Sequence, residues 1–358
     1  MKKKICFLIG NLNLTGGTER VTTLIVNALA ENSEYDISIL SLADGTRPFF
    51  ELHPSIETFS LYSHSVSMKK NFFGAVWKIR QFIIDQQVDT LIVVDSIACL
   101  FTIPALWRLK VKHICWEHFN FKNNNGIKLR DFARIWAAKY CDYIVILTKR
   151  DKEFWEQGLK KIKAKIVSIP NPTSYKNVEH HPQLAFKVFL AVGRLVNVKG
   201  FDMLIDAWAR VCHDTHGWKL RIVGSGEEER NLKQQVEYLG ITEYVEFISA
   251  TKNIEEHYRT ASFFCLSSRF EGFPMVLLEA QTFGLPIVSY DCDTGPSELV
   301  NTNTGILVES NNISEFANAM AKMVACEEDK YKGLVENSFI LSNQFSIDCI
   351  KKLWVKIL

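Results

Sequence analysis

The segment Arg269–Ala280 carries the most informative pair of acidic residues in the sequence. Glu271 and Glu279 lie eight positions apart, and Pro274 between them favours the first position of a helix. This predicts Glu271 in the loop before the helix and Glu279 in its second turn. Free amides in the first turn, near Phe273–Val276, attract an anion, and carboxylates accept hydrogen bonds from hydroxyl groups. The spacing therefore indicates a ligand that carries both an anion and hydroxyls.

The alternative for Glu271 and Glu279 is structural, with the first capping the helix and the second lying on the surface. The intervening residues Met275–Leu278 are apolar, however, so the helix is predicted to be mostly buried. A glutamate in a buried helix needs a partner. We therefore interpret both glutamates as functional.

Two cations follow another apolar run. Arg194 and Lys199 come directly after the predicted strand Phe186–Val192. Arginine offers a planar fork and lysine a point charge, which together suit a diphosphate. The alternative is a solvated basic turn, but parallel sheets bind ligands at this carboxyl edge. Gly224 follows the next predicted strand, Lys219–Val223, and we expect it to be small because a ligand passes close to the backbone.

Further candidates lie in the first half of the chain. Gly16 and Gly17 come between the strand Ile5–Ile9 and a helix, where backbone amides can approach a phosphate. They lack the GxGxxG pattern and its later acidic residue, which argues against an NAD-dependent oxidoreductase. His118 follows the strand His113–Trp116 and could bind a sugar hydroxyl or handle a proton. The alternatives are an ordinary turn and a histidine satisfied within the fold.

Asp291 and Asp293 could pass for a metal-binding DxD motif. The two cations described above already neutralise phosphate, and Asp293–Glu298 is typical of a turn that leads into a helix. We therefore expect no metal ion.

Apolar strand-like runs alternate with helical stretches along all 358 residues. Strands that are apolar on both faces predict parallel sheets covered by helices. The predicted strands are Ile5–Ile9, Ile37–Leu42, Thr90–Val94, His113–Trp116, Tyr143–Leu147, Phe186–Val192, Lys219–Val223, Val245–Ile248, Phe263–Leu266 and Ile287–Tyr290. The length exceeds the usual limit of a single core, which is about 250–300 residues. Ile169–Pro172 and the polar stretch Thr173–Gln183 predict a linker between two doubly wound domains.

Composition excludes several classes of protein. A net charge of +2 is too small to indicate a nucleic-acid partner. The nine cysteines form no CxxC pair and no zinc spacing, which indicates buried thiols in a reducing compartment. The apolar run after Lys2–Lys4 is too short for a signal peptide, and no run reaches the ~18 residues of a membrane span. We expect a cytoplasmic protein.

Together these motifs resemble the retaining, GT-B-fold glycosyltransferases of family 4 (glycosyl transferases group 1), bacterial surface-polysaccharide type. The resemblance spans essentially the whole chain, and the motifs that carry it occur in family order: Gly16–Arg20, Gly193–Gly200, Gly224–Glu227 and Glu271–Glu279. It implies an α/β architecture of two doubly wound Rossmann-like domains facing across a cleft. Residues 1–171 would bind the acceptor and residues 172–345 the nucleotide sugar, with a C-terminal helix at 346–358 packing back on the first domain.

The resemblance also implies a role for each motif. Arg194 and Lys199 would hold the donor diphosphate, Glu279 the ribose hydroxyls, and Glu271 the transferred sugar, with His118 near the reacting centre. The catalytic residues would be His118, Glu271, Arg194 and Lys199. The donor-binding residues would be Gly16, Gly17, Arg194, Lys199, Gly224, Glu271, Gly272, Phe273, Pro274, Met275, Val276 and Glu279. No cofactor is expected, because the nucleotide sugar is the donor substrate.

The predicted function is transfer of a hexose or N-acetylhexosamine from a nucleotide diphosphate sugar to a glycan or lipid-linked glycan. Family usage favours a UDP-sugar, and GDP-mannose stays open. The product would belong to a capsule, exopolysaccharide or lipopolysaccharide. One alternative is a sugar-nucleotide epimerase or hydrolase, which would consume donor without acceptor. Another is a non-catalytic nucleotide-sugar-binding module, which would tolerate loss of Glu271, His118 or Arg194, yet all three are present.

Two stretches mix cations with aromatic residues, Ser67–Lys78 and Arg130–Tyr140. In the second, Arg130 and Arg134 stand near Phe132. Either stretch could lie at a lipid interface, which predicts peripheral contact with the inner face of the cell membrane. The alternative is an ordinary core-facing helix with a solvated basic edge.

Overall fold

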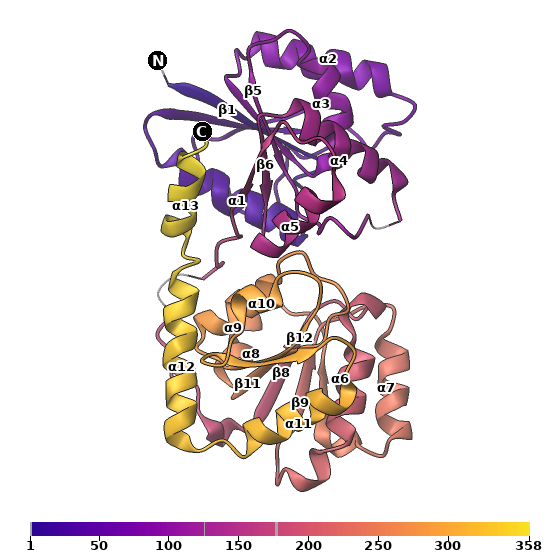
Figure 1. Cartoon of the computed structure of the whole chain (residues 1–358), viewed down its shortest axis with the longest axis vertical. Helices are drawn as coiled ribbons and strands as arrows, with labels where there is room; N and C mark the ends of the chain where they lie inside the picture. Colours follow the sequence, from indigo (N-terminus) through magenta and orange to yellow (C-terminus); the bar gives the residue numbers. More distant parts are fainter. Residues whose placement is uncertain (1, 125, 176–177) are drawn as a thin grey trace. The chain divides into compact units, whose positions relative to one another are not determined.

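The computed structural model describes residues 2–124, 126–175 and 178–358. The chain divides into two compact units. The N-terminal unit is Met1–Pro172 together with Ile347–Leu358, and the C-terminal unit is Thr173–Ser346. Figure 1 shows that each unit contains its own β-sheet flanked by helices.

The N-terminal unit is built on a parallel sheet. Its described residues contribute seven strands in the order β3-β2-β1-β4-β5-β6-β7. The strands are β1 Lys3–Ile9, β2 Tyr35–Ser41, β3 Glu57–Ser60, β4 Thr90–Val94, β5 Lys112–Trp116, β6 Tyr143–Ile146 and β7 Lys165–Ser168. The central strand β4 is buried along its whole length, because helices cover both faces of the sheet.

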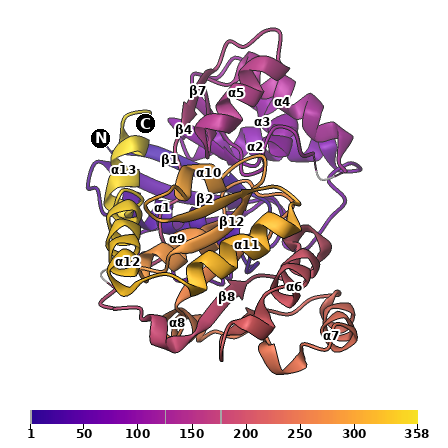
Figure 2. The ribbon, with the colours of Figure 1, turned by 60° about the horizontal axis from the view of Figure 1, so that its bottom comes forward.

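Helices connect most of the successive strands of this sheet, and one more comes from the C-terminal segment of the chain. They are α1 Gly17–Ala30, α2 Phe72–Asp85, α3 Cys99–Ala105, α4 Lys128–Tyr140, α5 Lys149–Gly158 and α13 Ile347–Val355, with the short 3-10 helix η1 Ser96–Ala98. Figures 1 and 2 both show α3 between α2 and α4. Contacts join α2 to α3 and α3 to α4.

The C-terminal helix α13 packs on the N-terminal unit, where it contacts α1. Trp354 is fully buried, with its ring centroid 4.8 Å from that of Trp116 and 6.4 Å from that of Phe7. Lys112 donates from Nζ to the carbonyl oxygen of Leu358 at 3.0 Å. The end of the chain therefore completes the core beside β1 and β5.

The C-terminal unit repeats the same architecture. Its described residues contribute six parallel strands in the order β10-β9-β8-β11-β12-β13. The strands are β8 Val188–Val192, β9 Lys219–Val223, β10 Val245–Ile248, β11 Phe263–Leu266, β12 Ile287–Asp291 and β13 Gly305–Glu309. In the core, the ring of Phe263 stacks on Phe189 at 5.1 Å and on Trp218 at 5.5 Å.

The helices of the C-terminal unit lie on both faces of its sheet (Figure 2). They are α6 Phe201–Ala209, α7 Glu229–Tyr238, α8 Ile254–Arg259, α9 Met275–Thr282, α10 Pro296–Leu299, α11 Ile313–Val324 and α12 Glu328–Asn343. Short 3-10 helices are η2 Leu184–Phe186, η3 Asn197–Lys199, η4 Cys212–Asp214 and η5 Thr242–Tyr244.

Each sheet has one point at which the strand order reverses. In the N-terminal unit it lies between β1 and β4, and in the C-terminal unit between β8 and β11. At such a switch point, the loops after the two strands diverge and leave a crevice where open α/β sheets bind ligands. A predicted site residue is therefore best placed to bind a ligand when it lies close to one of these two switch points.

The predicted fold class is confirmed: the chain has two parallel-sheet, doubly wound domains of the GT-B type. All ten predicted strands are present, within two residues at each end. β3, β7 and β13 were not predicted. Part of the predicted linker Thr173–Gln183, residues 176–177, lies outside the described residues. In the described chain, no helix combines the length and apolarity needed to cross a bilayer.

Candidate functional site

The loops after β8 and β11 meet at the switch point of the C-terminal sheet. Nζ of Lys199, at the end of η3, lies 2.7 Å from Oε1 of Glu271, in the loop after β11. The same carboxylate oxygen accepts a hydrogen bond from Oγ of Ser268 at 2.7 Å. Thr294, after β12, donates to the carbonyl oxygen of Glu271 at 2.6 Å. The predicted site residues Lys199 and Glu271 are thus in contact, and three loops hold Glu271 in place.

Arg194 lies on the same edge, two residues after β8 ends. Its side chain is exposed, and it forms no hydrogen bond or ion pair with any residue that the structure describes. Lys199, by contrast, is half-buried and paired. The loop after β8 therefore carries one exposed cation and a second that is held by a carboxylate, a combination that suits the two phosphates of a diphosphate.

Gly224 has a packing role that was not predicted from the sequence. A Cβ atom at this position would overlap the carbonyl oxygen of Gly193, because the loops after β8 and β9 touch there. Close packing of two backbones is therefore enough to require glycine at 224, and the predicted contact with a ligand stays a prediction. Gly200 has φ +63° and connects η3 to α6, so it supplies the left-handed turn that places Lys199.

Helix α9 begins one residue later than predicted, at Met275, with Pro274 preceding it. The first-turn amides of Met275 and Val276 have no acceptor within the helix, as in any α-helix. No side chain at the N-cap accepts from them either. Glu279 is in the second turn and is buried, 3% exposed. Its Oε2 accepts a hydrogen bond from the hydroxyl of Tyr258 at 2.9 Å. The surface alternative for Glu279 is therefore wrong.

Two supporting residues of this site were not predicted from the sequence. Arg269 donates to both carboxylate oxygens of Asp202, in the first turn of α6. The guanidinium holds the pKa of the Asp202 carboxyl below its usual value, despite the opposing effect of partial burial. This bidentate pair ties the loop that carries Glu271 to α6.

The Asp291–Asp293 segment leads into α10, as predicted. Gly295 has φ +99°, and α10 begins at Pro296. A Cβ atom at 295 would overlap the ring of Pro274, so this turn packs against the loop before α9. The segment therefore supports the loop that carries Glu271.

In the N-terminal unit, Gly16 and Gly17 start α1 after β1. A Cβ atom at Gly17 would meet no described atom within 4 Å, and one at Gly16 would meet only the flexible side chain of Glu19. Neither glycine has a positive φ that would require it. Since packing and backbone geometry do not explain the two glycines, the open space beside them is available to a ligand.

His118 is two residues beyond β5 and is partly exposed. Its Nε2 atom is buried and hydrogen-bonds to no described residue. Burial lowers the pKa of His118 to about 4, with Glu117 opposing the shift, so the ring is neutral at pH 7. The ring packs on Trp116, with centroids 4.5 Å apart.

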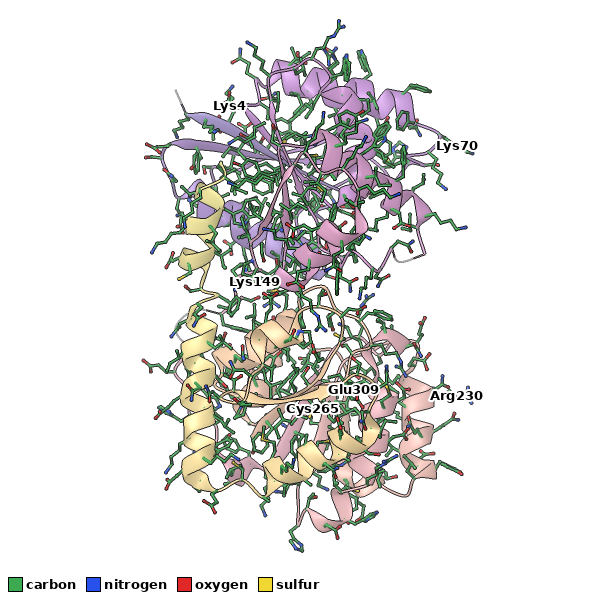
Figure 3. All side chains as sticks on the ribbon, in the orientation of Figure 1. Lys4, Lys70, Lys149, Arg230, Cys265 and Glu309 are labelled. Atoms are coloured by element: carbon green, nitrogen blue, oxygen red, sulfur yellow. The ribbon has the colours of Figure 1, made fainter. Side chains whose placement is uncertain are left out.

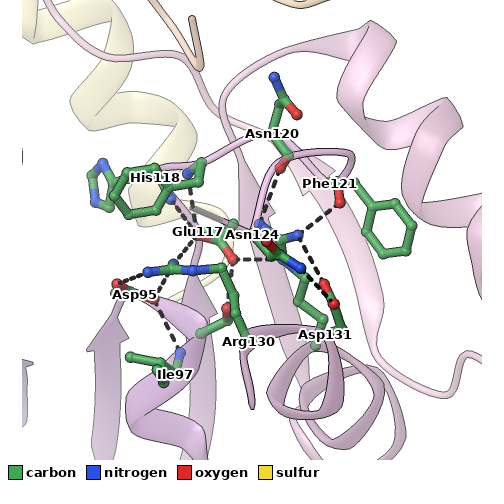
Figure 4. A network of polar contacts seen from close by, with 12 residues as sticks. Asp95, Ile97, Glu117, His118, Asn120, Phe121, Asn124, Arg130 and Asp131 are labelled. Atoms are coloured by element: carbon green, nitrogen blue, oxygen red, sulfur yellow. Dashed lines mark hydrogen bonds and ion pairs between the residues drawn. The ribbon is translucent and has the colours of Figure 1, made fainter. Parts of the chain in front are cut away.

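A buried ionic network lies directly behind His118 (Figure 4). Arg130 donates from its two terminal nitrogens to the two carboxylate oxygens of Asp95, at 2.6 and 3.1 Å. Arg134 donates from Nε to Oε2 of Glu117 at 3.1 Å, and Ser96 donates to the same oxygen. Burial, with Glu117 nearby, raises the pKa of Asp95. Asp95 comes directly after β4, so the network lies at the switch edge of this sheet. The backbone of Asp95 has a φ of +82°, which is rare for a residue with a side chain.

The network also positions the chain around His118. Oε1 of Glu117 accepts hydrogen bonds from the backbone amides of His118 and Phe119, at 3.0 and 3.1 Å. Arg134 donates to the carbonyl oxygens of Asn120 and Phe121, at 3.0 and 2.7 Å. The loop after β5 is therefore held from both sides. Sequence reasoning placed Arg130 and Arg134 at a basic surface, but they are 3% and 1% exposed.

One group in the described chain has ligand atoms close enough to hold a metal ion: Cys99, His113 and Cys141, all within 4.8 Å of one another. All three are buried in the N-terminal core. Nδ1 of His113 lies 3.5 Å from Sγ of Cys141, and its Nε2 lies 3.0 Å from Oγ1 of Thr102. Both ring nitrogens thus have partners, and burial lowers the pKa of His113 to about 4. We interpret the group as packed, neutral thiols and imidazole.

Two family patterns match the chain, one in each half of the sequence. The pattern of Glycosyltransferase Family 4 matches residues 15–175, and that of Glycosyl transferases group 1 matches residues 174–339. A Haemophilus influenzae protein named "Uncharacterized glycosyltransferase" is 38% identical, over 99% of this chain and all of that one. The chain belongs to the group 1 glycosyltransferases.

Other relatives of this glycosyltransferase have more specific names. A Campylobacter jejuni enzyme is 29% identical over 99% of this chain and 98% of its own. It is named as an α-1,4-N-acetyl-D-galactosaminyltransferase for a GalNAc-containing diNAcBac-PP-undecaprenol. Among solved structures, the lipopolysaccharide outer core galactosyltransferase WaaB has a TM-score of 0.80 at 23% identity, covering 99% and 98% of the two chains. Anabaena HepE, solved with UDP, has a TM-score of 0.76 at 18% identity, covering 99% of each chain.

Proposed function

We propose that this glycosyltransferase moves a hexose or an N-acetylhexosamine from a nucleotide diphosphate sugar to a glycan or lipid-linked glycan. We take a UDP-sugar as the first donor to test, and synthesis of capsule, exopolysaccharide or lipopolysaccharide as the setting. The observation that carries the proposal is the contact between Lys199 and Glu271 at the switch edge of the C-terminal sheet, with Arg194 in the same loop as Lys199. The name of the Campylobacter relative supports a lipid-linked acceptor.

The donor would lie along the carboxyl edge of the C-terminal sheet. Arg194 and Lys199 would offset the charge of the diphosphate, and the first-turn amides of Met275 and Val276 would donate to it. Glu279 would accept hydrogen bonds from the ribose hydroxyls. Glu271 would accept them from the transferred sugar. Both carboxylates are already held by neighbouring side chains, so little ordering is needed when the donor binds.

The reaction needs the negative charge that develops on the departing nucleotide to be stabilised. The bond between the anomeric carbon and the phosphate oxygen breaks, and its electron pair goes to the nucleotide diphosphate. The acceptor oxygen forms a bond to the anomeric carbon on the same face, so the configuration is retained. The acceptor's hydroxyl proton passes to a phosphate oxygen. His118, neutral at pH 7, would hydrogen-bond a sugar hydroxyl near the reacting carbon.

In this scheme fixed cations take the place of a metal ion at the diphosphate. No covalent sugar intermediate is required. Isolation of a sugar adduct on Glu271 would contradict same-face attack and would support a double displacement.

The acceptor would bind to the N-terminal unit. A hollow of about 650 Å³ there is lined mainly by hydroxyl, amide and charged groups that can hydrogen-bond to sugars. The lining residues are Asn13, Asp44, Thr46, Arg47, Thr58, Phe59, Ser60 and Ser63. Gly16 and Gly17 lie farther along the loop that carries Asn13, where the phosphates or the acceptor would approach. The free cysteines fit a reducing compartment such as the cytoplasm.

The proposal is tested by thermal-shift screening with UDP-, GDP- and ADP-sugars, with and without EDTA. A ligand that binds only the folded state raises the melting temperature by mass action. We expect a shift with one UDP-sugar that EDTA leaves unchanged and Arg194→Ala abolishes. No shift with any nucleotide sugar would contradict the donor assignment, and donor breakdown that is independent of acceptor would favour a hydrolase or epimerase.

A further inference from the structure

Helix α4 combines two arginines with three alanines on its buried face and carries large apolar side chains on its outer face. Its buried face contains Arg130 and Arg134, while Phe132, Ile135 and Tyr140 on the other face are 46%, 49% and 46% exposed. A helix on the surface of a soluble domain normally buries its apolar residues and exposes its charges. The inner face is explained by the ionic network with Asp95 and Glu117. Contacts among the described residues of the N-terminal unit do not account for the large apolar side chains on the outer face.

The exposed side chains of α4 form a continuous aromatic row. The ring centroids of Phe132 and Trp136 are 5.0 Å apart, and those of Trp136 and Tyr140 are 6.2 Å apart. Nζ of Lys139 lies 5.0 Å from the centroid of the Tyr140 ring. Amphipathic aromatic rings beside lysines are typical of helices that lie in a membrane interface.

Helix α2 carries a second row of the same kind. Phe73, Trp77 and Ile84 recur at helical spacing and are 85%, 61% and 45% exposed, opposite a buried row of Ala75, Ile79 and Ile83. The opposite face of α2 packs on the core, so the exposed apolar row is not needed to hold this helix in the fold.

Trp107, which follows α3, is a further exposed aromatic residue. Its side chain is 62% exposed. Arg80 of α2 donates to the carbonyl oxygen of Trp107 at 2.9 Å and to that of Ala105 at 2.8 Å. The helices that carry or precede these three groups lie side by side in the order α2, α3, α4 (Figures 1 and 2). We call residues 67–85, 107–110 and 127–140 the α2–α4 face.

The α2–α4 face gathers both apolar and positively charged groups. Of the fifteen large apolar side chains exposed in the described part of the chain, nine belong to it, although it is only a small part of the sequence. Its residues, all of which the structure describes, include six exposed cations and two exposed acids. The cations are Lys69, Lys70, Arg108, Lys110, Lys128 and Lys139, and the acids are Asp85 and Asp131. Figure 3 shows Lys70 projecting outward at the edge of the unit.

We propose that the α2–α4 face docks on an anionic lipid bilayer, with its aromatic side chains at the headgroup boundary and its cations against lipid phosphates. The surface is apolar and carries more cations than acids, which matches an anionic bilayer. A protein partner of mixed charge would not require an excess of cations. The inference deepens the proposed function, on which its biological sense rests, by placing the enzyme at the surface where a lipid-linked acceptor would lie.

Vesicle flotation tests the proposal without using donor or activity. Vesicles of phosphatidylcholine alone are compared with vesicles in which about one third of the lipid is phosphatidylglycerol, at low and high salt. We expect binding to the anionic vesicles only, weakened by salt. The double variant Phe73→Ser/Trp77→Ser and the variant Phe132→Ser should each reduce the bound fraction roughly tenfold or more. Tyr238→Ser, at a 90% exposed position in the C-terminal unit, is the matched control and should bind like the wild type.

Three results would overturn the proposal. One is no flotation with anionic vesicles at low salt. The second is equal flotation of the aromatic variants and the Tyr238→Ser control. The third is self-association of the wild type in sedimentation experiments that the aromatic variants abolish, without vesicle binding. A nucleotide-sugar thermal shift measured on the same variants checks that they are folded, so failure of membrane binding and failure of donor binding are separate results.

Discussion

Nζ of Lys199 lies 2.7 Å from Oε1 of Glu271, although the two residues are 72 positions apart in the chain. The pair joins the loops after β8 and β11, which diverge at the switch point of the C-terminal sheet. An ion pair at this edge keeps a cation in place before a diphosphate arrives. In the proposed reaction Lys199 would be shared between Glu271 and the diphosphate, and the account rests on this relationship.

Replacing Lys199 by alanine should lower kcat/KM strongly. A preorganised donor to the developing charge contributes roughly 100- to 1,000-fold, equivalent to about 2.7–4 kcal/mol, in other enzymes. We expect a loss of this order in a transfer assay with saturating acceptor. Lys233→Ala is the control, because Lys233 pairs with Glu229 on the surface of α7 and should leave the rate within about twofold. Equal rates for both variants would rule out a role for Lys199.

Replacing Glu279 by glutamine should affect donor binding more than turnover. The glutamine can still accept a hydrogen bond from Tyr258, so the local fold should persist. Loss of a charged acceptor for a ribose hydroxyl costs about 1.5–3 kcal/mol. We therefore expect KM for the donor to rise roughly tenfold or more with kcat nearly unchanged, as measured by initial rates. A fall in kcat at constant KM would place Glu279 at the reacting centre instead.

The pair Glu117 and Arg134 should be strongly coupled. Removing one partner of a buried ion pair leaves an uncompensated charge and costs about 3–5 kcal/mol. Arg134→Met should therefore destabilise the N-terminal unit by this order in denaturant unfolding. Adding Glu117→Gln to that variant should cost much less than Glu117→Gln alone. Additive effects of the two substitutions would mean that the contact at 3.1 Å contributes little.

Asp151 should make stability depend on pH. Burial raises the pKa of this carboxyl to about 7, against an ordinary value of 3.8, although the amide of Phe121 donates to it. Between these values the folded state binds the proton more tightly than the unfolded state, so stability from this group is lost as pH rises. The melting temperature of Asp151→Asn relative to the wild type should therefore increase as pH rises from about 4 to 7. A difference that is independent of pH would contradict this assignment.

The sequence predicts the core strands better than the edge strands. Strands such as β4 and β11 are buried throughout, so their apolar runs are unbroken. The three strands that were not predicted, β3, β7 and β13, each lie at an edge of a sheet and are partly exposed. An edge strand contacts one neighbour only, so its sequence need not be apolar on both faces.

The candidate site was predictable where it depends on residues that follow buried strands. Lys199 and Glu271 were found in this way. The other partners of Glu271, Ser268 and Thr294, were not predicted, and neither was the pair of Arg269 with Asp202, because these contacts form only through the fold. The packing of Gly224 against Gly193 was not predicted for a related reason, since a backbone that passes close by leaves no mark in the sequence.

Arg130 and Arg134 show how a correct motif can be misplaced. Their i, i+4 spacing put them on one face of a helix, and their charge indicated the surface. The acids that neutralise them, Asp95 and Glu117, stand at the carboxyl ends of two neighbouring strands. Only the order of strands in the sheet shows that these four residues meet.

The central claim is that Arg194 and Lys199 form the diphosphate site, and calorimetric titration of UDP tests it most directly. The wild type, Arg194→Ala, Lys199→Ala and the Lys233→Ala control would be titrated in the presence of EDTA. The account predicts that UDP binds the wild type and the control with similar affinity, and binds Arg194→Ala and Lys199→Ala at least roughly tenfold more weakly, since each charge-assisted contact is worth about 1.5–3 kcal/mol. Equal affinity in all four proteins would place the nucleotide elsewhere and contradict the account.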